Sequence, residues 1–183
     1  RPSIRLLRTC MTETTQSNGT SYVYDVANRP SSVDGVTYTW DNNGNLINDG
    51  TSTYSYDYNN KLVGLTQGTD VYQYVYNGLG DRVQQIVNGV VTDYVLDINT
   101  GLTQVLQDGT NTYLYGVNRV AQSTTTETEY FLADALGSVR NLMDETAAIT
   151  LTQSYSPFGE VLESTGDGQT DYAITGEMFD PVT

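Results

Sequence analysis

The sequence predicts an all-β protein built of consecutive β-hairpins, and three observations support this fold class. Tyrosine dominates the aromatic residues, with 15 copies against 3 phenylalanines and 1 tryptophan. Tyrosine suits a strand surface, where the ring packs and the hydroxyl reaches water or a backbone group. Aromatic residues recur in pairs at alternate positions, which is the period of a strand. The chain also has 17 glycines, many of them directly after Asn or Asp, a pattern typical of tight hairpin turns.

The aromatic pairs define an internal repeat. Each clear copy reads aromatic-x-aromatic, then Asp or Asn, then a short stretch rich in Asn and Gly. The clear copies carry Tyr22, Tyr24 and Asp25; Tyr38, Trp40 and Asp41; Tyr54, Tyr56 and Asp57; and Tyr74, Tyr76 and Asn77. Weaker copies begin at Tyr94, Tyr113 and Tyr130, and equivalent positions lie 16, 16, 20, 20, 19 and 17 residues apart. This spacing is too short for a βαβ unit and fits a two-stranded hairpin with its turns.

The residues after each aromatic pair predict the turn. An Asp at this place can accept hydrogen bonds from backbone N–H groups two residues on, and a later Gly or Asn supplies the positive φ that the turn needs. The turns at the other ends of the hairpins are predicted at Asp34-Gly35, Asp49-Gly50, Asn88-Gly89 and Asp108-Gly109. The best helical candidate, Ala133–Leu136, holds barely one turn.

The net charge limits the kinds of partner that the chain is expected to bind. The net charge is −14 with only 8 basic residues, too few to line a groove that follows nucleic-acid phosphates. We therefore expect no nucleic-acid partner and no membrane insertion, since no apolar stretch reaches the length of a membrane span. A basic partner surface or loosely held divalent cations would suit the field. The chain does not begin with Met, and we expect both ends to have been cut from something longer.

Few residues are candidates for catalysis or metal binding. The chain has no histidine, which excludes Ser-His-Asp and Cys-His catalysis, and the single Cys10 can form neither an internal disulfide nor a structural zinc site. Asp41–Asn45 has oxygen side chains at alternate positions, as a calcium loop has, but Leu46 stands where the EF-hand needs glycine. A turn is favoured there, and also for Asp25 and Asp57 over a glycosidase pair. We predict no catalytic, cofactor-binding or metal residue, and no enzyme.

The aromatic repeat resembles the YD repeat of bacterial RHS proteins and of the related animal teneurins. Three later segments resemble the RHS-associated core that follows such repeats: Tyr130–Arg140 with Gly137 in "L-G-S-x-R", Tyr155–Glu160 with Pro157, Phe158 and Gly159 in "Y-x-P-F-G-E", and Thr175–Asp180. The family's next stretch, a Gly-Leu-Tyr-Tyr and Arg-Tyr-Tyr-Asp-Pro run, is absent because the chain stops at Thr183.

This resemblance implies a long β-sheet strip, spirally wound or extended, that forms a segment of a hollow shell. In bacterial members the shell encloses a C-terminal toxin domain. The domains we expect are an unassigned lead at 1–19, YD hairpins at 20–125 and a truncated core-like segment at 126–183. The function we expect is structural, in a large secreted or cell-surface bacterial protein. Its partners would be the remainder of the parent chain and a C-terminal toxin.

Two other functions stay open. Repeated exposed tyrosines could stack against sugar rings and make the chain a glycan- or cell-surface-binding module. The chain could also be the remnant of an aspartate-dependent autoprotease. The family's autoproteolytic aspartates lie beyond the missing stretch, however, so the role does not transfer to Asp180 beside Pro181. Unpaired strand edges further predict self-association of the isolated chain.

Overall fold

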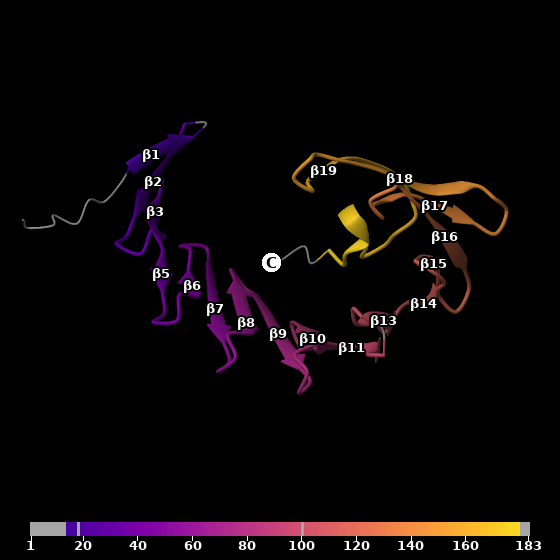
Figure 1. Cartoon of the computed structure of the whole chain (residues 1–183), viewed down its shortest axis with the longest axis horizontal. Helices are drawn as coiled ribbons and strands as arrows, with labels where there is room; N and C mark the ends of the chain where they lie inside the picture. The colour runs from indigo at the N-terminus through magenta and orange to yellow at the C-terminus, as the bar shows by residue number, and fades with distance from the viewer. Residues whose placement is uncertain (1–13, 18, 100, 180–183) are drawn as a thin grey trace, which may run out of the picture. The chain divides into compact units, whose positions relative to one another are not determined.

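The computed structural model describes residues 14–17, 19–99 and 101–179 and confirms the all-β prediction (Figure 1). Within these ranges the chain forms strands β1 to β19 and one short 3₁₀ helix, η1 (Ile174–Gly176). All strand pairs are antiparallel, and within each sheet every strand pairs with its neighbours along the chain. The fold is therefore a meander of consecutive hairpins.

The chain divides into two compact units, residues 1–91 and 92–183, which we describe separately. The first unit contains two sheets. The first sheet consists of β1 (Thr14–Ser17), β2 (Thr20–Tyr24), β3 (Pro30–Val33) and β4 (Val36–Thr37). The second sheet consists of β5 (Thr39–Trp40), β6 (Leu46–Asn48), β7 (Ser52–Tyr56), β8 (Leu62–Gln67), β9 (Asp70–Tyr76), β10 (Arg82–Val87) and β11 (Val90–Asp93).

The second unit contains the third sheet and η1. Its strands are β12 (Val95–Asp97), β13 (Gln104–Gln107), β14 (Thr112–Tyr115), β15 (Arg119–Ser123), β16 (Thr128–Ala133), β17 (Val139–Asp144), β18 (Ile149–Tyr155) and β19 (Val161–Gly166). Pairing between β15 and β16 carries the sheet through the domain boundary predicted at 125/126, for example at Ala121 opposite Tyr130. The boundary between YD hairpins and the core-like segment therefore stays a prediction, and it concerns the type of repeat and not a break in the sheet.

The hydrogen-bonded strand pairing stops between one sheet and the next, and the break lies at the first tyrosine of an aromatic pair. Tyr38 separates β4, which pairs with β3, from β5, which pairs with β6. Tyr94 likewise separates β11 from β12, and these two strands lie in different sheets. One extended segment thus contributes its two halves to two different ladders.

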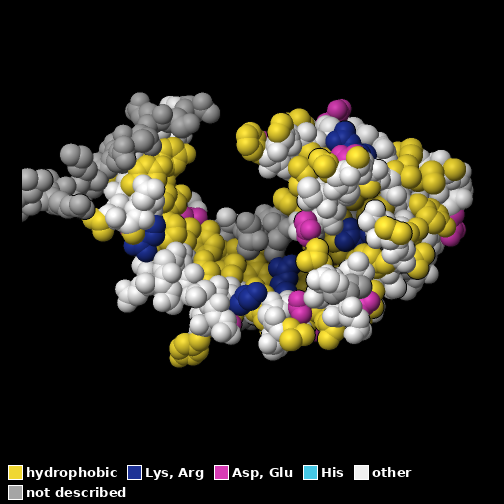
Figure 2. Space-filling model, viewed as in Figure 1, with side chains coloured by type: hydrophobic (Ala, Val, Ile, Leu, Met, Phe, Trp, Pro, Cys, Tyr) yellow, Lys and Arg dark blue, Asp and Glu magenta, His cyan; other side chains and the backbone are white. Residues whose placement is uncertain are grey.

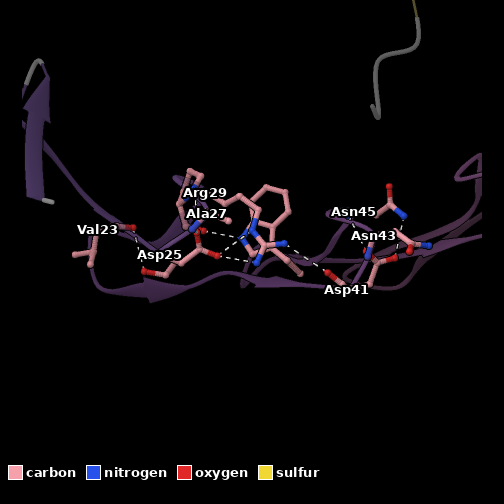
Figure 3. Close-up of polar contacts among 10 residues, drawn as sticks. Val23, Asp25, Ala27, Arg29, Asp41, Asn43 and Asn45 are labelled. Atoms are coloured by element: carbon pink, nitrogen blue, oxygen red, sulfur yellow. Dashed lines mark hydrogen bonds and ion pairs between the residues drawn. The ribbon is translucent and has the colours of Figure 1, made fainter. Parts of the chain in front are cut away.

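The same five-residue loop follows the four clear aromatic pairs, as predicted. In the copy that starts at Asp25, one carboxylate oxygen accepts the N–H groups of Ala27 and Arg29, while the backbone of Asp25 bonds to Asn28 and Arg29 (Figure 3). The fourth residue, Asn28, has φ +61°. The loop recurs with the same four bonds from Asp41, Asp57, Asn77, Asp134, Asp144 and Ser156. Each loop is closed by the side chain of its own first residue.

The fourth loop residue needs a left-handed backbone, which explains the Asn or Gly there. Asn60 has φ +60° and Gly80 has φ +91°. An Asn tolerates this region at low steric cost and Gly at none. The segment Ala133–Leu136, the best helical candidate in a sequence predicted to be nearly all β, is not helical for the same reason: Ala133 ends β16, and Asp134 begins one of these loops, with Gly137 at φ +88°. Local hydrogen bonding by Asp134 competes there with helix formation.

Two kinds of turn recur at the opposite ends of the hairpins. Asp34-Gly35 and Asn88-Gly89 have positive φ at both residues, as a two-residue type I′ hairpin turn requires. In the other kind, Asp49 accepts the N–H groups of Thr51 and Ser52 on one oxygen and the Tyr54 hydroxyl, at 2.8 Å, on the other. The sequence Asp-Gly-Thr-x-Thr-Tyr recurs from Asp108, whose carboxylate binds the Tyr113 hydroxyl. This second motif was not recognised from the sequence.

The core lies on the tyrosine side of the strands. In β9, Tyr72 and Tyr74 are buried whereas Val71 and Val75 are exposed. In the second unit, the core cluster contains Tyr113, Val139, Leu142, Leu151 and Tyr172. Tyrosine therefore takes the place that aliphatic residues usually hold.

Candidate functional site

The tyrosine side of the sheets is the candidate site, and some of the predicted signature residues, among them Trp40 and Tyr76, lie on it. The second aromatic of a pair reaches across its hairpin to the strand that leaves the preceding loop. Tyr76 donates to the carbonyl oxygen of Leu62 at 2.8 Å, and Trp40 Nε1 donates to that of Pro30 at 2.7 Å. In the second unit, Tyr115 donates to the Val105 carbonyl at 2.9 Å. Tyr155, which belongs to no aromatic pair, makes the same kind of bond to the Val139 carbonyl at 2.7 Å. We call this bond the aromatic latch.

A cation accompanies several latches. The Arg29 guanidinium lies 5.6 Å from the Trp40 ring centroid, the Lys61 ammonium lies 5.6 Å from that of Tyr76, and the Arg140 guanidinium lies 5.7 Å from that of Tyr155. Cation–π contacts of this kind stabilise by about 0.5–1 kcal/mol at exposed sites. Each latch therefore combines a hydrogen bond with ring stacking, and it ties one loop to the next.

The loop carboxylates are held in their charged form. The N–H of Arg29, and then its side chain, hold the pKa of Asp25 below its ordinary value, and the N–H of Asn45 does the same for the pKa of Asp41. At Asp49, burial raises the pKa, but the N–H groups of Thr51 and Ser52 outweigh it and lower the pKa to about 2. These carboxylates are committed to turn geometry, since their oxygens are occupied by hydrogen bonds.

A C-terminal segment, residues 167–179, covers the tyrosine side of the third sheet. Figure 1 shows η1 on the inner side of the curved sheet in this unit. The backbone N–H of Val139 donates to the carbonyl of Ala173 at 3.1 Å, and that of Thr175 donates to the Ser138 hydroxyl at 3.1 Å. The Gln122 amide donates to the Gln169 carbonyl at 2.6 Å. Tyr172, 3% exposed, completes the core.

Arg119, the first residue of β15, is the centre of the contacts that hold this docked segment. Its guanidinium carbon lies 3.0 Å from the ring centroid of Tyr172, and 5.4–5.8 Å from those of Tyr113, Tyr115 and Phe131. One guanidinium nitrogen donates to the carbonyl of Gly176 at 3.1 Å. The four rings form an aromatic cage around one cation, and the cation holds the segment by stacking on Tyr172 and by bonding the backbone beyond it.

Two buried tyrosine hydroxyls are electrostatically unusual. Burial, reinforced by the hydrogen bond to the Asp108 carboxylate, raises the pKa of Tyr113 far above its ordinary range. Burial also raises the pKa of Tyr172, although the Arg119 charge opposes this. Both phenols are therefore neutral at any physiological pH. Tyr113 acts as a packing and hydrogen-bonding group, and Tyr172 acts as a packing group.

Two of the signature residues predicted in the RHS-core-like segments, Gly137 and Gly159, lie close to the docked segment. Gly137 and Gly159 both have positive φ, and a Cβ on Gly137 would lie 3.3 Å from the Thr175 carbonyl oxygen. Pro157 and Phe158 instead lie exposed at the tip of a loop. The cage around Arg119 was not predicted, because nothing in the local pattern relates Arg119 to Gly176. Cys10, Asp180 and Pro181 lie outside the described residues.

The aromatic residues of the YD pairs offer little free surface for sugar stacking. From Tyr22 to Tyr115 the paired aromatics are half-buried or buried, with Tyr74 only 3% exposed. Only Tyr130, in a weak copy, counts as exposed among the described pairs. Glycan binding stays a prediction without a specific contact in its favour.

In residues 14–17, 19–99 and 101–179, no three His, Cys, Asp or Glu side chains are grouped so as to hold a metal ion. No helix in the same ranges has the length and hydropathy of a membrane span. The described residues thus form a face of latched tyrosines and a docked segment.

Hairpin repeats with tyrosine latches define the chain as a repetitive β-sheet protein of the YD type. The Teneurin YD-shell family matches residues 8–183, and the chain belongs to this family. The RHS/YD resemblance read from the sequence is thereby confirmed, as is the repeat fold.

The chain is also similar to curated proteins and solved structures. It is 27% identical over 188 residues to the tRNA3(Ser)-specific nuclease WapA of Bacillus spizizenii and to the tRNA nuclease WapA of Bacillus subtilis strain 168. Each match covers 94% of this chain and 8% of the relative. The TcdB2-TccC3-Cdc42 and TcdB2-TccC3-TEV crystal structures match 91% and 92% of this chain and 11% of theirs, with TM-scores of 0.56 and 0.54 and identities of 15% and 14%. These structures share the fold.

Proposed function

We propose that this chain is a structural wall segment of a YD shell and performs no chemistry of its own. The observation that carries this proposal is the docked segment 167–179, which the third sheet holds on its tyrosine side through Arg119 and the Val139–Ala173 bond. The tyrosine side of the third sheet thus binds a segment of the same chain. The signature residues from Tyr22 to Gly159 then serve as turn, latch and packing residues.

The parent protein is proposed to carry a C-terminal toxin that the shell encloses, and to be secreted or displayed on a bacterial surface. Two of its relatives are named as tRNA nucleases, and this chain spans 8% of their length. A nuclease activity would reside elsewhere in such a protein, because this stretch has no histidine and a net charge of −14. Within the stretch, YD hairpins at 20–125 would form the wall and 126–183 would begin its closure.

The absence of chemistry can be tested with the purified 183-residue chain. Incubation with total tRNA should leave every band intact on a denaturing gel, with and without added Mg²⁺. Intact-mass measurement over days should likewise show an unchanged chain. Cleavage of tRNA, or a new mass from self-cleavage, would contradict the proposal.

Enclosure is tested on the full chain that the surrounding gene encodes. Protease treatment of that protein should leave a C-terminal domain intact under native conditions and digest it once denaturant opens the shell. Immediate digestion of a C-terminal domain at native conditions would show that it is not enclosed. The glycan alternative is tested by an array, on which a strong signal lost with Tyr130→Ala would support binding.

A further inference from the structure

Arg82 and Arg119 occupy the same position in two copies of the repeat. Each is the residue directly after its loop. Each also pairs across the ladder with the second tyrosine of its aromatic pair, Arg82 with Tyr76 and Arg119 with Tyr115, and a shift in strand register adjoins both pairs. The backbone therefore presents the two arginines in the same way, one in the first unit and one in the second.

The surroundings of the two guanidinium groups are equivalent as well. The Arg82 guanidinium carbon lies 5.4 Å from the Tyr74 ring centroid, and that of Arg119 lies 5.8 Å from the Tyr113 ring centroid. These tyrosines are the first members of the two aromatic pairs, and their exposed fractions are 3% and 4%. Each arginine thus lies on the tyrosine side of its sheet, beside a buried ring.

The fold of the repeat does not require arginine at this position. In other copies the residue opposite the second aromatic is proline or leucine: Pro30 opposite Tyr24, Leu46 opposite Trp40, and Leu62 opposite Tyr56. These copies still form the same five-residue loop. The guanidinium groups of Arg82 and Arg119 therefore serve a purpose other than closing the hairpin.

In the third sheet, the guanidinium at this position binds polypeptide. Arg119 stacks on the Tyr172 ring at 3.0 Å and donates to the Gly176 carbonyl at 3.1 Å, so it holds an aromatic side chain and a backbone group of one segment. A guanidinium does both at once because it stacks through its planar face and donates from its edge. Arg82 has the same position and the same buried first tyrosine, which gives the second sheet the same means of binding.

The charges near Arg82 favour an acidic ligand. The Lys61 ammonium lies 5.6 Å from the Tyr76 ring centroid, so two cations accompany one aromatic pair. Figure 2 shows Lys and Arg side chains set among hydrophobic ones on the face in view. The docked segment 167–179, which Arg119 holds, contains Asp167, Asp171 and Glu177 and no Lys or Arg. A peptide of this composition complements the charge of both arginine positions.

We propose that Tyr74, Tyr76, Arg82 and Lys61 form a second peptide-binding site, the Arg82 site, on the tyrosine side of the second sheet. Its ligand is an acidic polypeptide segment that stacks an aromatic ring on the Arg82 guanidinium and offers a backbone carbonyl to its N–H groups. The Arg82 site is independent of the proposed wall function, since it rests on the equivalence of two arginines within the chain.

Fluorescence anisotropy tests binding to the purified 183-residue chain. The probe is a dye-labelled synthetic peptide with the sequence of residues 167–179, and it should bind the unaltered chain saturably. Arg82→Lys keeps the charge but cannot both stack and donate in the same way, so it should raise the dissociation constant at least tenfold. Val75→Thr, at an exposed position between the two tyrosines of β9, should change it less than twofold. Absence of saturable binding, or equal effects of the two variants, overturns the proposal.

The place and chemistry of the contact are tested from the side of the peptide, with no change in the protein. A probe carrying Tyr172→Ala should bind at least tenfold more weakly. A probe with p-benzoylphenylalanine in place of Tyr172 should cross-link under light to β9 or β10, as mass spectrometry of the digest identifies. Cross-links to β14 or β15 instead would show that the peptide displaces the docked segment at Arg119, and this result overturns the proposal, as does full affinity of the Tyr172→Ala probe.

Discussion

The hydroxyl of Tyr76 donates a 2.8 Å hydrogen bond to the carbonyl oxygen of Leu62, fourteen residues earlier on the neighbouring strand. The bond lies at the open end of the hairpin formed by β8 and β9, and Lys61 stacks on the same ring. A hairpin whose turn fixes one end is thus fixed at the other end by a side chain. Trp40, Tyr115 and Tyr155 form the same kind of latch.

Removing the latch hydroxyl should lower stability by a small, defined amount. We expect Tyr76→Phe to reduce the free energy of unfolding by about 0.5–1.5 kcal/mol, because the ring and its Lys61 contact stay while one hydrogen bond is lost. Urea unfolding followed by circular dichroism measures the change. Tyr58→Phe, at a fully exposed loop tip, is the matched control and should alter nothing. Equal effects of the two variants would contradict the latch.

Glycine at the fourth loop position should be required more strictly where the docked segment is near. Gly80 and Gly137 have φ +91° and +88°, so alanine at either should cost about 1–2 kcal/mol. At Gly137 the added Cβ would also meet the Thr175 backbone, whereas at Gly80 it would meet only the flexible end of Lys61. Gly137→Ala should therefore be the more destabilising of the two in thermal unfolding. The reverse order would contradict the docking contact.

Arg119→Lys should release the C-terminal segment without unfolding the sheet. Lysine keeps the charge but cannot reproduce both the stack on Tyr172 and the bond to Gly176. We expect faster amide hydrogen exchange at residues 170–179, with little change in β8 and β9. Arg82→Lys, which alters a cation over Tyr74 in the first unit, serves as the control. Unchanged exchange at 170–179 in Arg119→Lys would show that the cage does not hold the segment.

Stability should fall at both extremes of pH. The folded-state pKa values of Asp25, Asp41 and Asp49 lie below the ordinary 3.8, and that of Asp49 is about 2. Their contribution is therefore present above about pH 4 and is lost as pH falls towards 2. The pKa values of Tyr113 and Tyr172 are raised above 10, so their contribution is present below pH 10 and is lost as pH rises further.

Urea midpoints measured from pH 2 to 11 should accordingly be flat between about 5 and 9, since the chain has no histidine. Tyrosinate absorbance should show rings that ionise only on unfolding, and Tyr113→Phe should remove one of them. Asp49→Asn should flatten the acid limb. A midpoint that declines steadily between pH 5 and 8 would contradict this assignment.

The isolated chain should self-associate more readily as salt is raised. Its net charge of −14 opposes contact at low salt, and 0.1 M salt screens exposed charges more than about 10 Å apart. Static light scattering from 10 mM to 0.5 M NaCl measures the mass. A mass of one chain throughout would show that the strand edges do not pair under these conditions.

The sequence was sufficient to predict the loop that follows each clear aromatic pair, but neither the Asp49–Tyr54 motif nor the latches. The aromatic pair, the Asp that follows it and the Asn or Gly three residues later predicted the loop, because all its bonds fall within five residues. Contacts between different hairpins could not be predicted from the sequence. The Arg119–Gly176 bond joins residues 57 apart, and the ladder interruptions at Tyr38 and Tyr94 occur within extended segments whose local sequence is ordinary for a strand.

The self-closed loop also bears on how such a protein can change over evolutionary time. Every bond that shapes the loop from Asp57 is made within residues 57–61. A gene duplication that adds one hairpin therefore carries the complete instructions for its loop with it. The spacings of 16 residues from Tyr22 to Tyr38 and of 20 residues from Tyr54 to Tyr74 differ by two residues per strand, and an even number keeps each tyrosine on its original side. Growth of a hairpin by pairs of residues in each strand therefore leaves its loop and its tyrosine side unchanged.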